Sequence, residues 1–404
     1  MNKKTIATFL VIIILIIYIL SENKITNIDN YAYVVSIGID EGENSPLKVS
    51  FQIANTSDSG SSSDTDSSTS KSIISSVETT SIDNAINLIN TYISKELSLS
   101  HCKAIVISEK LAYGGISKYL YPIMNKTEVS PKANIIISTV DCETFLREAS
   151  KSVEENSTKY YNIIPTTYNY TGYTDDVTLR DFFSKLGDSF AEPYASLGNV
   201  KTSETKNNSL FYLNDETDYV KQINTSVNSP DNISMNGIAV FNKDVLVGKL
   251  NSIETICHLI LLNKLETAII SIPSPFNDSN SIDLSISLRK NTKYNVKLIN
   301  GTPLISLNIY INTEVLNILD LNNENVKEIK KYADSYIKNA INDYLYKTSK
   351  EFKSDIIGMG KYVVNNFITW DEWINYNWLN QYENSFFETN VDTNINSDYI
   401  IFKS

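Results

Sequence analysis

The sequence predicts an α+β fold, in which mixed α/β domains with mainly antiparallel sheets follow an N-terminal membrane-anchor helix. Three observations lead to this prediction. The chain begins with an apolar run, residues 6–20, behind two lysines. Short strand-like segments joined by turns follow, and this is the pattern of β-hairpins. These segments alternate with helical stretches over 404 residues, a length that favours two or three folded units.

The apolar run is the first predicted element. Lys3 and Lys4 precede IATFLVIIILIIYIL, a membrane-targeting segment whose positive end stays in the cytoplasm. As a helix it is about 22 Å long, and lysine snorkelling with local thinning would match it to a hydrocarbon core of roughly 30 Å. A cleaved signal peptide is the alternative, but the end of the run, YILS, lacks the small residues that signal peptidase requires. We therefore expect residues 1–21 to be a retained anchor, with the rest of the chain outside the cytoplasm.

The exported part divides at a polar segment. Residues 22–198 form the first predicted domain; its elements are a hairpin (31–40 and 47–54), a flexible Ser/Thr loop (56–72), a helix from Ile82 capped by Ser81, buried strands at 104–108 and 133–140, a helix capped by Asp141, and a helix at 178–186 that ends at Gly187. Residues 199–232 are polar and weakly periodic, which predicts the domain junction. The second domain, 233–404, has a hairpin (237–250), a helix (254–262), strands at 282–289, 294–299 and 304–313, a long helix around 326–345, and final strands near 387–395 and 399–402. A further division into 233–265 and 266–404 is left open.

Composition excludes several classes of protein. The chain has 35 basic and 47 acidic residues, a net charge of −12 and a pI near 4.8. Such a surface repels nucleic acid, whose binding depends on basic groups, and it keeps the domains away from anionic lipid headgroups. Two histidines and three cysteines nearly exclude zinc clusters and a disulfide framework. A pairing of Cys102 with Cys142 would need two strands to bring them together, so we expect these thiols and Cys257 to be buried and free.

The search for reactive groups finds none. His101 and Cys102 are neighbours on a strand and point to opposite faces, so they would not form a reacting pair. His258 lies in an apolar helix, which favours a structural histidine. A carboxylate pair for glycoside hydrolysis cannot be placed among the 47 acidic residues. We therefore expect no catalytic, cofactor-binding or metal-binding residue, no cofactor, and a protein that is not an enzyme.

Three other patterns have ordinary interpretations. Gly358 and Gly360 do not follow a strand and lack the Walker spacing, so they do not predict a phosphate loop. Gly114-Gly115 indicates a break between a strand–helix unit and its neighbour. The aromatic cluster consists of Trp370, Trp373, Tyr376 and Trp378. It would suit a sugar platform, but such clusters more often form a core corner or a protein interface.

Five segments in order along the chain share their pattern with one known family. They are VVSIGID (34–40), FQIA (51–54), LSLSHCKAIVISEKLA (97–112), the hairpin 237–250 with Glu254 after it, and DIIGMGKY (355–362). Together they resemble the Ger(x)C family, the C subunit of the bacterial spore germinant receptor, of which GerAC is a member. The resemblance implies an elongated array of mixed α/β domains, with germination-protein domains at 22–198 and 233–404.

The resemblance also implies a function. It is that of a non-catalytic subunit, which acts with A-type and B-type subunits at the spore inner membrane or cell membrane in nutrient-triggered germination. Family members are typically lipoproteins with a cysteine after the signal segment. Here that position falls near Ser21-Glu22 and no cysteine precedes Cys102, so no lipidation site is predicted and the retained helix would be the anchor. The alternative is a membrane-anchored exported hydrolase or binding protein that acts on cell wall or polysaccharide.

Overall fold

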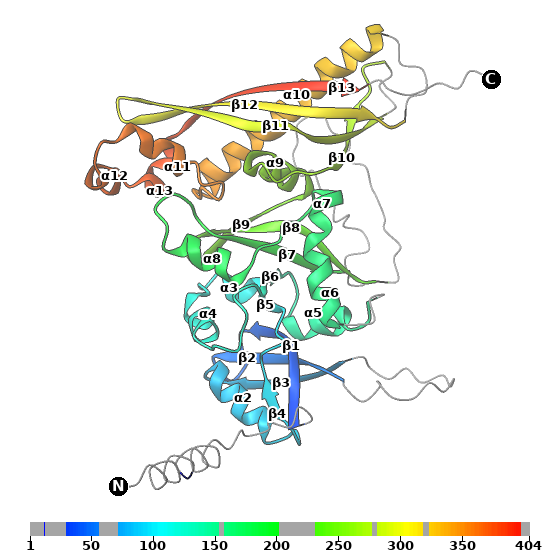
Figure 1. The fold of residues 1–404 in the computed structure, drawn as a ribbon, viewed down its shortest axis with the longest axis vertical. Coiled ribbons are helices and arrows are strands. Elements are labelled where there is room, and N and C mark those ends of the chain that lie inside the picture. The colour runs from blue at the N-terminus through cyan, green and yellow to red at the C-terminus, as the bar shows by residue number, and fades with distance from the viewer. Residues whose placement is uncertain are drawn as a thin grey trace, which may run out of the picture.

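The structure is a computed structural model that describes residues 12, 30–55, 72–152, 157–201, 231–276, 281–317 and 323–396. Apart from a few residues at their ends and Ile12, the predicted anchor (1–21), the Ser/Thr loop (56–72), the junction (199–232) and the strand near 399–402 lie outside the described residues. In the described part of the chain, no helix has the length and apolar character needed to cross a membrane. The molecule is elongated along the vertical axis of Figure 1, with one sheet in its lower part and a second sheet near the top.

The first sheet has nine strands in the order β3-β2-β1-β5-β6-β7-β8-β9, with β4 beside β1. Their bounds are β1 Tyr31–Asp40, β2 Leu47–Ala54, β3 Ser72–Thr79, β4 Glu96–Ser98, β5 Ala104–Ser108, β6 Asn134–Ser138, β7 Tyr194–Val200, β8 Ile233–Asn242 and β9 Val245–Leu250. The central strands β1, β5, β6 and β7 run parallel to one another through crossover connections, and β4 is parallel to β1, whereas the other pairs are antiparallel. Both predicted hairpins, β1–β2 and β8–β9, are confirmed.

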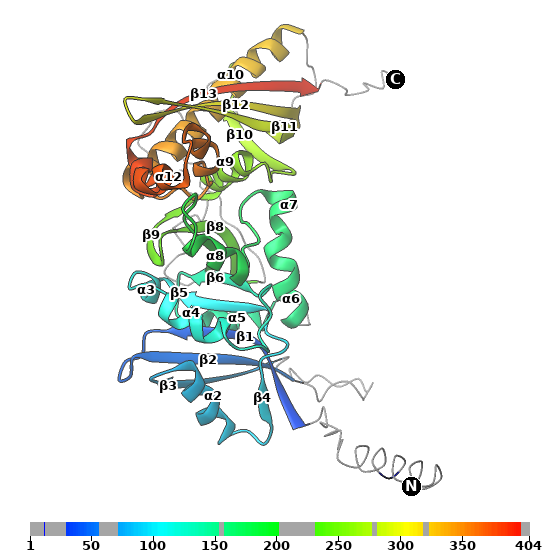
Figure 2. The ribbon, with the colours of Figure 1, turned by 60° about the vertical axis from the view of Figure 1, so that its left-hand side comes forward.

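Helices flank this sheet (Figure 2). Their bounds are α2 Ile82–Asn90, α3 Glu109–Ala112, α4 Ser117–Met124, α5 Cys142–Ala149, α6 Ser157–Ile163, α7 Tyr168–Thr171, α8 Leu179–Leu186 and α9 Ser252–Leu262, with a 3₁₀ turn, Ile164–Thr167, between α6 and α7. The predicted caps are confirmed, since the side chains of Ser81 and Asp141 accept hydrogen bonds from the backbone of their own first turns. Gly187 does end α8, but with φ at −100° it needs no left-handed backbone.

The second sheet has four strands in the order β10-β11-β12-β13. Their bounds are β10 Ala268–Pro273, β11 Ser281–Ile299, β12 Thr302–Val315 and β13 Phe386–Asn396. The first two pairings are antiparallel and β12–β13 is parallel. The prediction of two strands at 282–289 and 294–299 is wrong. They form the single strand β11, because register shifts around Lys290 take up the polar residues between them without breaking the pairing.

The long helix α10, Asn323–Tyr346, packs against the second sheet and ends in a π-helical turn, Lys347–Glu351. The short helices α11 Gly360–Val363, α12 Trp370–Tyr376 and α13 Trp378–Gln381, with 3₁₀ turns at Val364–Asn366 and Tyr382–Asn384, lead back to β13. On β12, the residues Ile305, Leu307, Ile309 and Ile311 are buried in a core that also holds Ile329, Ile337 and Ile341 of α10. The alternate residues of β12 are half-exposed on the opposite face of the sheet.

The first sheet continues across the segment at which the sequence predicts the domain junction. Strands β7 and β8 flank that segment and pair directly, so β8 and β9 belong to the same sheet as β1–β7. The largest core cluster then extends from Tyr194 of β7 and Val240 of β8, through α9, to the inner face of the second sheet. The predicted α+β class, an elongated array of mixed α/β structure with mainly antiparallel sheets, is confirmed.

Candidate functional site: a buried polar junction

Two buried carboxylates lie between the first sheet and the part of the chain that carries the second sheet. Asp175 precedes α8, Asp355 follows α10, and both side chains have no exposed surface. We call the residues around these two carboxylates the polar junction. An ionised carboxylate in such a place is costly unless it receives hydrogen bonds or a compensating charge, so the partners of each one decide what it does.

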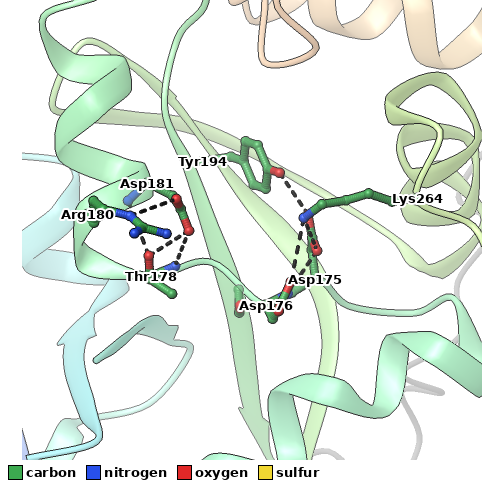
Figure 3. Close-up of polar contacts among 8 residues, drawn as sticks. Asp175, Asp176, Thr178, Arg180, Asp181, Tyr194 and Lys264 are labelled. Atoms are coloured by element: carbon green, nitrogen blue, oxygen red, sulfur yellow. Dashed lines mark hydrogen bonds and ion pairs between the residues drawn. The ribbon is translucent and has the colours of Figure 1, made fainter. Parts of the chain in front are cut away.

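Asp175 is held by a cation and a phenol (Figure 3). The Nζ atom of Lys264 donates to the two carboxylate oxygens over 2.9 and 3.0 Å, and the Tyr194 hydroxyl donates over 2.7 Å. Lys264 is placed by the end of α9, where Asn263 adopts a left-handed φ of 61°. Burial alone would raise the pKa of Asp175, but Lys264 and Tyr194 outweigh it and lower that pKa below its usual range. Asp175 therefore remains ionised at neutral pH.

The ring of Tyr194 has two further basic neighbours. The Nζ atom of Lys185 lies 3.8 Å from the ring centroid and donates to the carbonyl of Ile356. Burial lowers the pKa of Lys185 to about 8. His258 meets the Tyr194 ring edge to face at 4.6 Å, and its Nδ1 lies 2.7 Å from the Tyr344 hydroxyl. Burial lowers the pKa of His258 to about 3, so the imidazole is neutral.

Asp355 is held by neutral donors. Its carboxylate accepts hydrogen bonds from the backbone N–H groups of Gly358 (2.9 Å) and Gly360 (3.2 Å) and from Nε1 of Trp378 (2.8 Å). Gly358 has a left-handed φ of +79°, and a Cβ on Gly360 would lie 2.7 Å from the Cα of Phe190. Gly358 and Gly360, whose spacing does not fit a phosphate loop, therefore donate their backbone N–H groups to a carboxylate of the chain itself. Burial raises the pKa of Asp355 to about 6.

The segment that carries Asp355 is tied to the first sheet by backbone contacts. The N–H of Glu192 donates to the carbonyl of Asp355 over 2.8 Å, and the Ser354 hydroxyl donates to the carbonyl of Phe241 in β8. The Glu192 carboxylate in turn accepts the N–H of Lys243 over 2.7 Å, and burial raises its pKa to about 7. These hydrogen bonds therefore attach the loop that follows α10 to the end of the first sheet.

The aromatic cluster forms a corner of this junction. Trp373 and Trp378 are each 1% exposed, and Nε1 of Trp373 donates to the hydroxyl of Ser189 over 2.9 Å. Phe190 stacks on Trp373 with ring centroids 5.2 Å apart. Trp370 is exposed. The sequence offers three interpretations of the cluster: a sugar platform, a core corner and a protein interface. For Trp373 and Trp378 this arrangement favours the core corner.

The other residues that the sequence analysis considered lie apart from the junction. His101 is exposed and its ring lies 4.6 Å from that of Tyr33, whereas Cys102 is buried. Cys102, Cys142 and Cys257 are free and buried, as predicted, and burial raises the pKa of Cys102 to about 12. Across the described residues, no three His, Cys, Asp or Glu side chains come together as metal ligands.

The VVSIGID segment has a structural role within β1. Asp40 accepts the backbone N–H of Cys142 at the start of α5 over 3.0 and 3.1 Å. A Cβ on Gly38 would lie 2.7 Å from the Cβ of Cys142, so only glycine allows the helix to approach the strand this closely. This segment therefore positions α5 on the first sheet.

Sequence reasoning did not find Asp175, Tyr194 or Lys264. Asp175 and Lys264 are 89 positions apart and belong to no local motif, so only the tertiary fold brings them together. The oxygens of Asp175 and Asp355 already accept hydrogen bonds from this chain. The arrangement is suited to holding chain segments in place rather than to binding a substrate. Fold and junction together define an elongated scaffold of two sheets joined by buried polar contacts.

Comparison with known proteins gives the family. The model of the spore germination protein N-terminal domain matches residues 24–199, and the model of the spore germination B3/GerAC-like C-terminal domain matches residues 236–398. The chain belongs to the Ger(x)C family of spore germination proteins, as the resemblance predicts. The crystal structure of the GerBC protein has a similar fold, with a TM-score of 0.52 and 13% sequence identity over 89% of this chain and 96% of that one. Among curated proteins, none matches this chain.

Proposed function

We propose that this chain is a non-catalytic C subunit of a spore germinant receptor and acts in nutrient-triggered germination through contacts with A-type and B-type subunits. The observation that carries the proposal is the ordered match of both family domains, residues 24–199 and 236–398. We also propose domains at 22–198 and 233–404, on either side of the 199–232 segment.

The chemistry of the polar junction supports a structural rather than a catalytic role for its residues. A general acid or base must reach a substrate within hydrogen-bond distance. Asp175, Asp355 and His258 are fully buried, and each is hydrogen-bonded within the chain, to Lys264, Gly358 and Tyr344 respectively. These groups therefore stabilise the packing of the two sheet-bearing parts of the chain against each other.

The N-terminal apolar run supports a membrane location. We propose that residues 1–21 anchor the protein in the spore inner membrane, with the two sheets on the extracytoplasmic side. Membrane fractionation of the full chain, followed by N-terminal sequencing, checks this. We expect an intact start at Met1 in the membrane fraction, and a mature terminus near Ser21 in the soluble fraction would contradict the anchor.

Gene deletion tests the function itself. In a strain that lacks its other germinant receptors, deletion should abolish germination in response to nutrients while dormant spores still form and still germinate with a non-nutrient trigger. Reintroduction of the gene should restore the response. In the same strain, an affinity-tagged chain should copurify with the A-type and B-type subunits. Normal nutrient germination of the deletion strain would contradict the proposal.

A further inference from the structure

Strand β13 forms one edge of the second sheet, and α10 covers only part of that edge. At Thr393 the backbone N–H donates to Oδ1 of Asp334 over 2.7 Å, and the carbonyl accepts a hydrogen bond from Nζ of Lys330. Both partners lie on α10, which crosses behind β13 at an angle (Figure 1). The helix therefore occupies the place of a neighbouring strand at this end of β13.

The start of β13 has no such cover. Alternate residues of a strand direct their backbone groups to the same edge, so Phe387, Thr389 and Val391 face the same side as Thr393. Among the described residues, no hydrogen bond from α10 reaches the backbone of these three. An uncovered edge of this kind is a template for another strand.

A groove of about 530 Å³ lies along this uncovered edge. The second half of α10 and the turn after it form one wall, with Lys338, Asn342 and Tyr346, and the first residues of β13 form the other. Phe386 and Tyr346 are 63% and 60% exposed, so the groove has apolar side chains at its rim. Both walls are therefore available to a ligand.

The floor of the groove is polar and incompletely hydrogen-bonded. Ser385 and Thr389 line it, and they are only 1% and 4% exposed. Neither side-chain hydroxyl has a hydrogen-bond partner within the described parts of the chain. Buried polar groups are nearly always paired, so two unpaired hydroxyls beside an open strand edge point to an occupant that brings hydrogen-bonding groups of its own.

The charge of the groove indicates the chemistry of that occupant. The exposed side chain of Lys338 takes part in no ion pair with a described residue, and Nζ of Lys350 lies 5.7 Å from the centroid of the Phe386 ring. Glu388 also lines the groove, but its carboxylate accepts a hydrogen bond from the Ser306 hydroxyl of β12. The two lysines therefore leave the rim net basic, on a chain whose net charge is −12. Such a rim attracts a segment that carries acidic side chains.

We propose that an extended segment of a partner protein, with acidic and apolar residues in alternation, adds to β13 as a further strand of the second sheet. Its backbone would pair with Phe387, Thr389 and Val391, an acidic side chain would face Lys338, and an apolar one would lie beside Phe386. The proposal rests on the geometry of the groove and does not require the function proposed above.

A binding experiment with a defined probe tests it. The probe is a short synthetic peptide of alternating glutamate and valine with a central phenylalanine, fluorescently labelled, and binding to the detergent-solubilised full chain is followed by anisotropy. Saturable binding is expected. Thr389→Pro should abolish it, because proline removes the N–H that faces the groove, a loss that edge strands tolerate. The matched control Thr389→Ser keeps both that N–H and the side-chain hydroxyl and should bind as the wild type does.

Two further arms keep the result decisive if Thr389→Pro fails to fold. The exposed substitution Lys338→Glu should weaken binding by about ten-fold through charge reversal. A probe methylated on alternate backbone nitrogens should not bind, since it cannot pair with the edge. Absence of binding to the wild-type chain, or equal binding of the methylated probe, overturns the proposal. A wild-type dimer in light scattering that Lys338→Glu dissociates would also overturn it, because a second copy of this chain would then occupy the edge.

Discussion

Asp175 and Asp355 are two fully buried carboxylates in one junction, yet their charges are stabilised in different ways. Asp175 faces the ammonium group of Lys264 and the hydroxyl of Tyr194, whereas Asp355 receives only uncharged N–H donors. The pKa of Asp175 is lowered and that of Asp355 is raised to about 6. Three neutral hydrogen bonds thus offset only part of the desolvation cost of a buried, ionised carboxylate. A neighbouring cation offsets that cost fully.

The difference also separates two structural tasks. The Asp175 centre joins the segment before α8 to the end of α9 through a charge pair. The Asp355 centre shapes a loop, because its acceptors determine where Gly358 and Gly360 lie. We therefore expect the free energy of unfolding to depend mainly on the Lys264 charge at the Asp175 centre. At the Asp355 centre it should depend mainly on the close packing around Gly360.

Removal of the Lys264 charge should have the largest effect. Lys264→Met leaves Asp175 buried with the Tyr194 hydroxyl but without its cation, and we expect a loss of about 3 kcal/mol in the free energy of unfolding. The matched control is Lys249→Met, whose side chain is as exposed as that of Lys264 (40%) but pairs with Glu109 at the surface. That variant should lose less than about 1 kcal/mol. Urea unfolding measures both, and equal losses would contradict the charge-pair interpretation.

A larger side chain at Gly360, in the Asp355 loop, should cause the next largest loss in the free energy of unfolding. A Cβ on Gly360 would meet Trp378 at 2.6 Å and the backbone of Phe190 at 2.7 Å, so Gly360→Ala should cost about 2 kcal/mol through overpacking. Gly187→Ala is the control, since nothing lies within 4 Å of its Cβ position. Thermal denaturation should leave this control within about 0.5 kcal/mol of the wild type. A neutral Gly360→Ala would show that the loop is not closely packed.

Removal of one neutral donor from Asp175 should cost less than removal of its cation. Tyr194→Phe deletes the hydroxyl at 2.7 Å but keeps the ring against Lys185 and His258. We expect a loss of about 1.5 kcal/mol, the usual value for a hydrogen bond to a charged group. Tyr113→Phe, which removes an exposed hydroxyl bound to Glu109, should be close to neutral in chemical denaturation. A Tyr194→Phe loss as large as that of Lys264→Met would contradict the ranking.

The smallest predicted effect is a change of pH dependence. The folded-state pKa of Glu192 is raised to about 7, so as pH rises above its ordinary value the unfolded chain loses this proton first and stability falls. Glu192→Gln should remove this fall, so that from pH 5 to pH 6 the variant gains about 1 kcal/mol relative to the wild type. Asp355 contributes with the same sign, whereas His258, with its lowered pKa, contributes stability that is lost as pH falls below 6.5.

The groups other than Glu192 are present in both proteins and cancel in the difference. Asp175 has a lowered pKa, so the stability that it contributes is lost only as pH falls below its ordinary value, outside this window. Urea titrations at several pH values give the comparison. A pH-independent difference between the two proteins would show that Glu192 is not protonated in the folded chain at pH 5.

Local sequence patterns predicted most of the first sheet. The β1–β2 hairpin, the Ser81 and Asp141 caps and the β8–β9 hairpin depend on residues within a few positions of one another. The continuous strand β11 was missed because a polar stretch reads as a loop, whereas register shifts keep it paired with β12. The pairing of β7 with β8 was missed as well, since a long polar segment separates them in sequence.

The polar junction was not predictable in the same way. Its chemistry comes from residues such as Asp175 and Lys264 that are distant in the chain, and no spacing rule connects them. For Gly358 and Gly360 the sequence argued against a phosphate loop, but only the fold shows that Asp355 takes the place of the anion. The family resemblance, by contrast, rested on ordered short segments, and the two family models confirm it.

Native-state hydrogen exchange tests most directly whether the polar junction makes the two sheets one cooperative body. The slowest amides of β6, in the first sheet, and of β12, in the second, should open with the same free energy in the wild-type chain. Lys264→Met should lower both by the same amount. If β12 keeps its wild-type protection while β6 loses it, or the reverse, the two sheets unfold independently and the junction does not couple them.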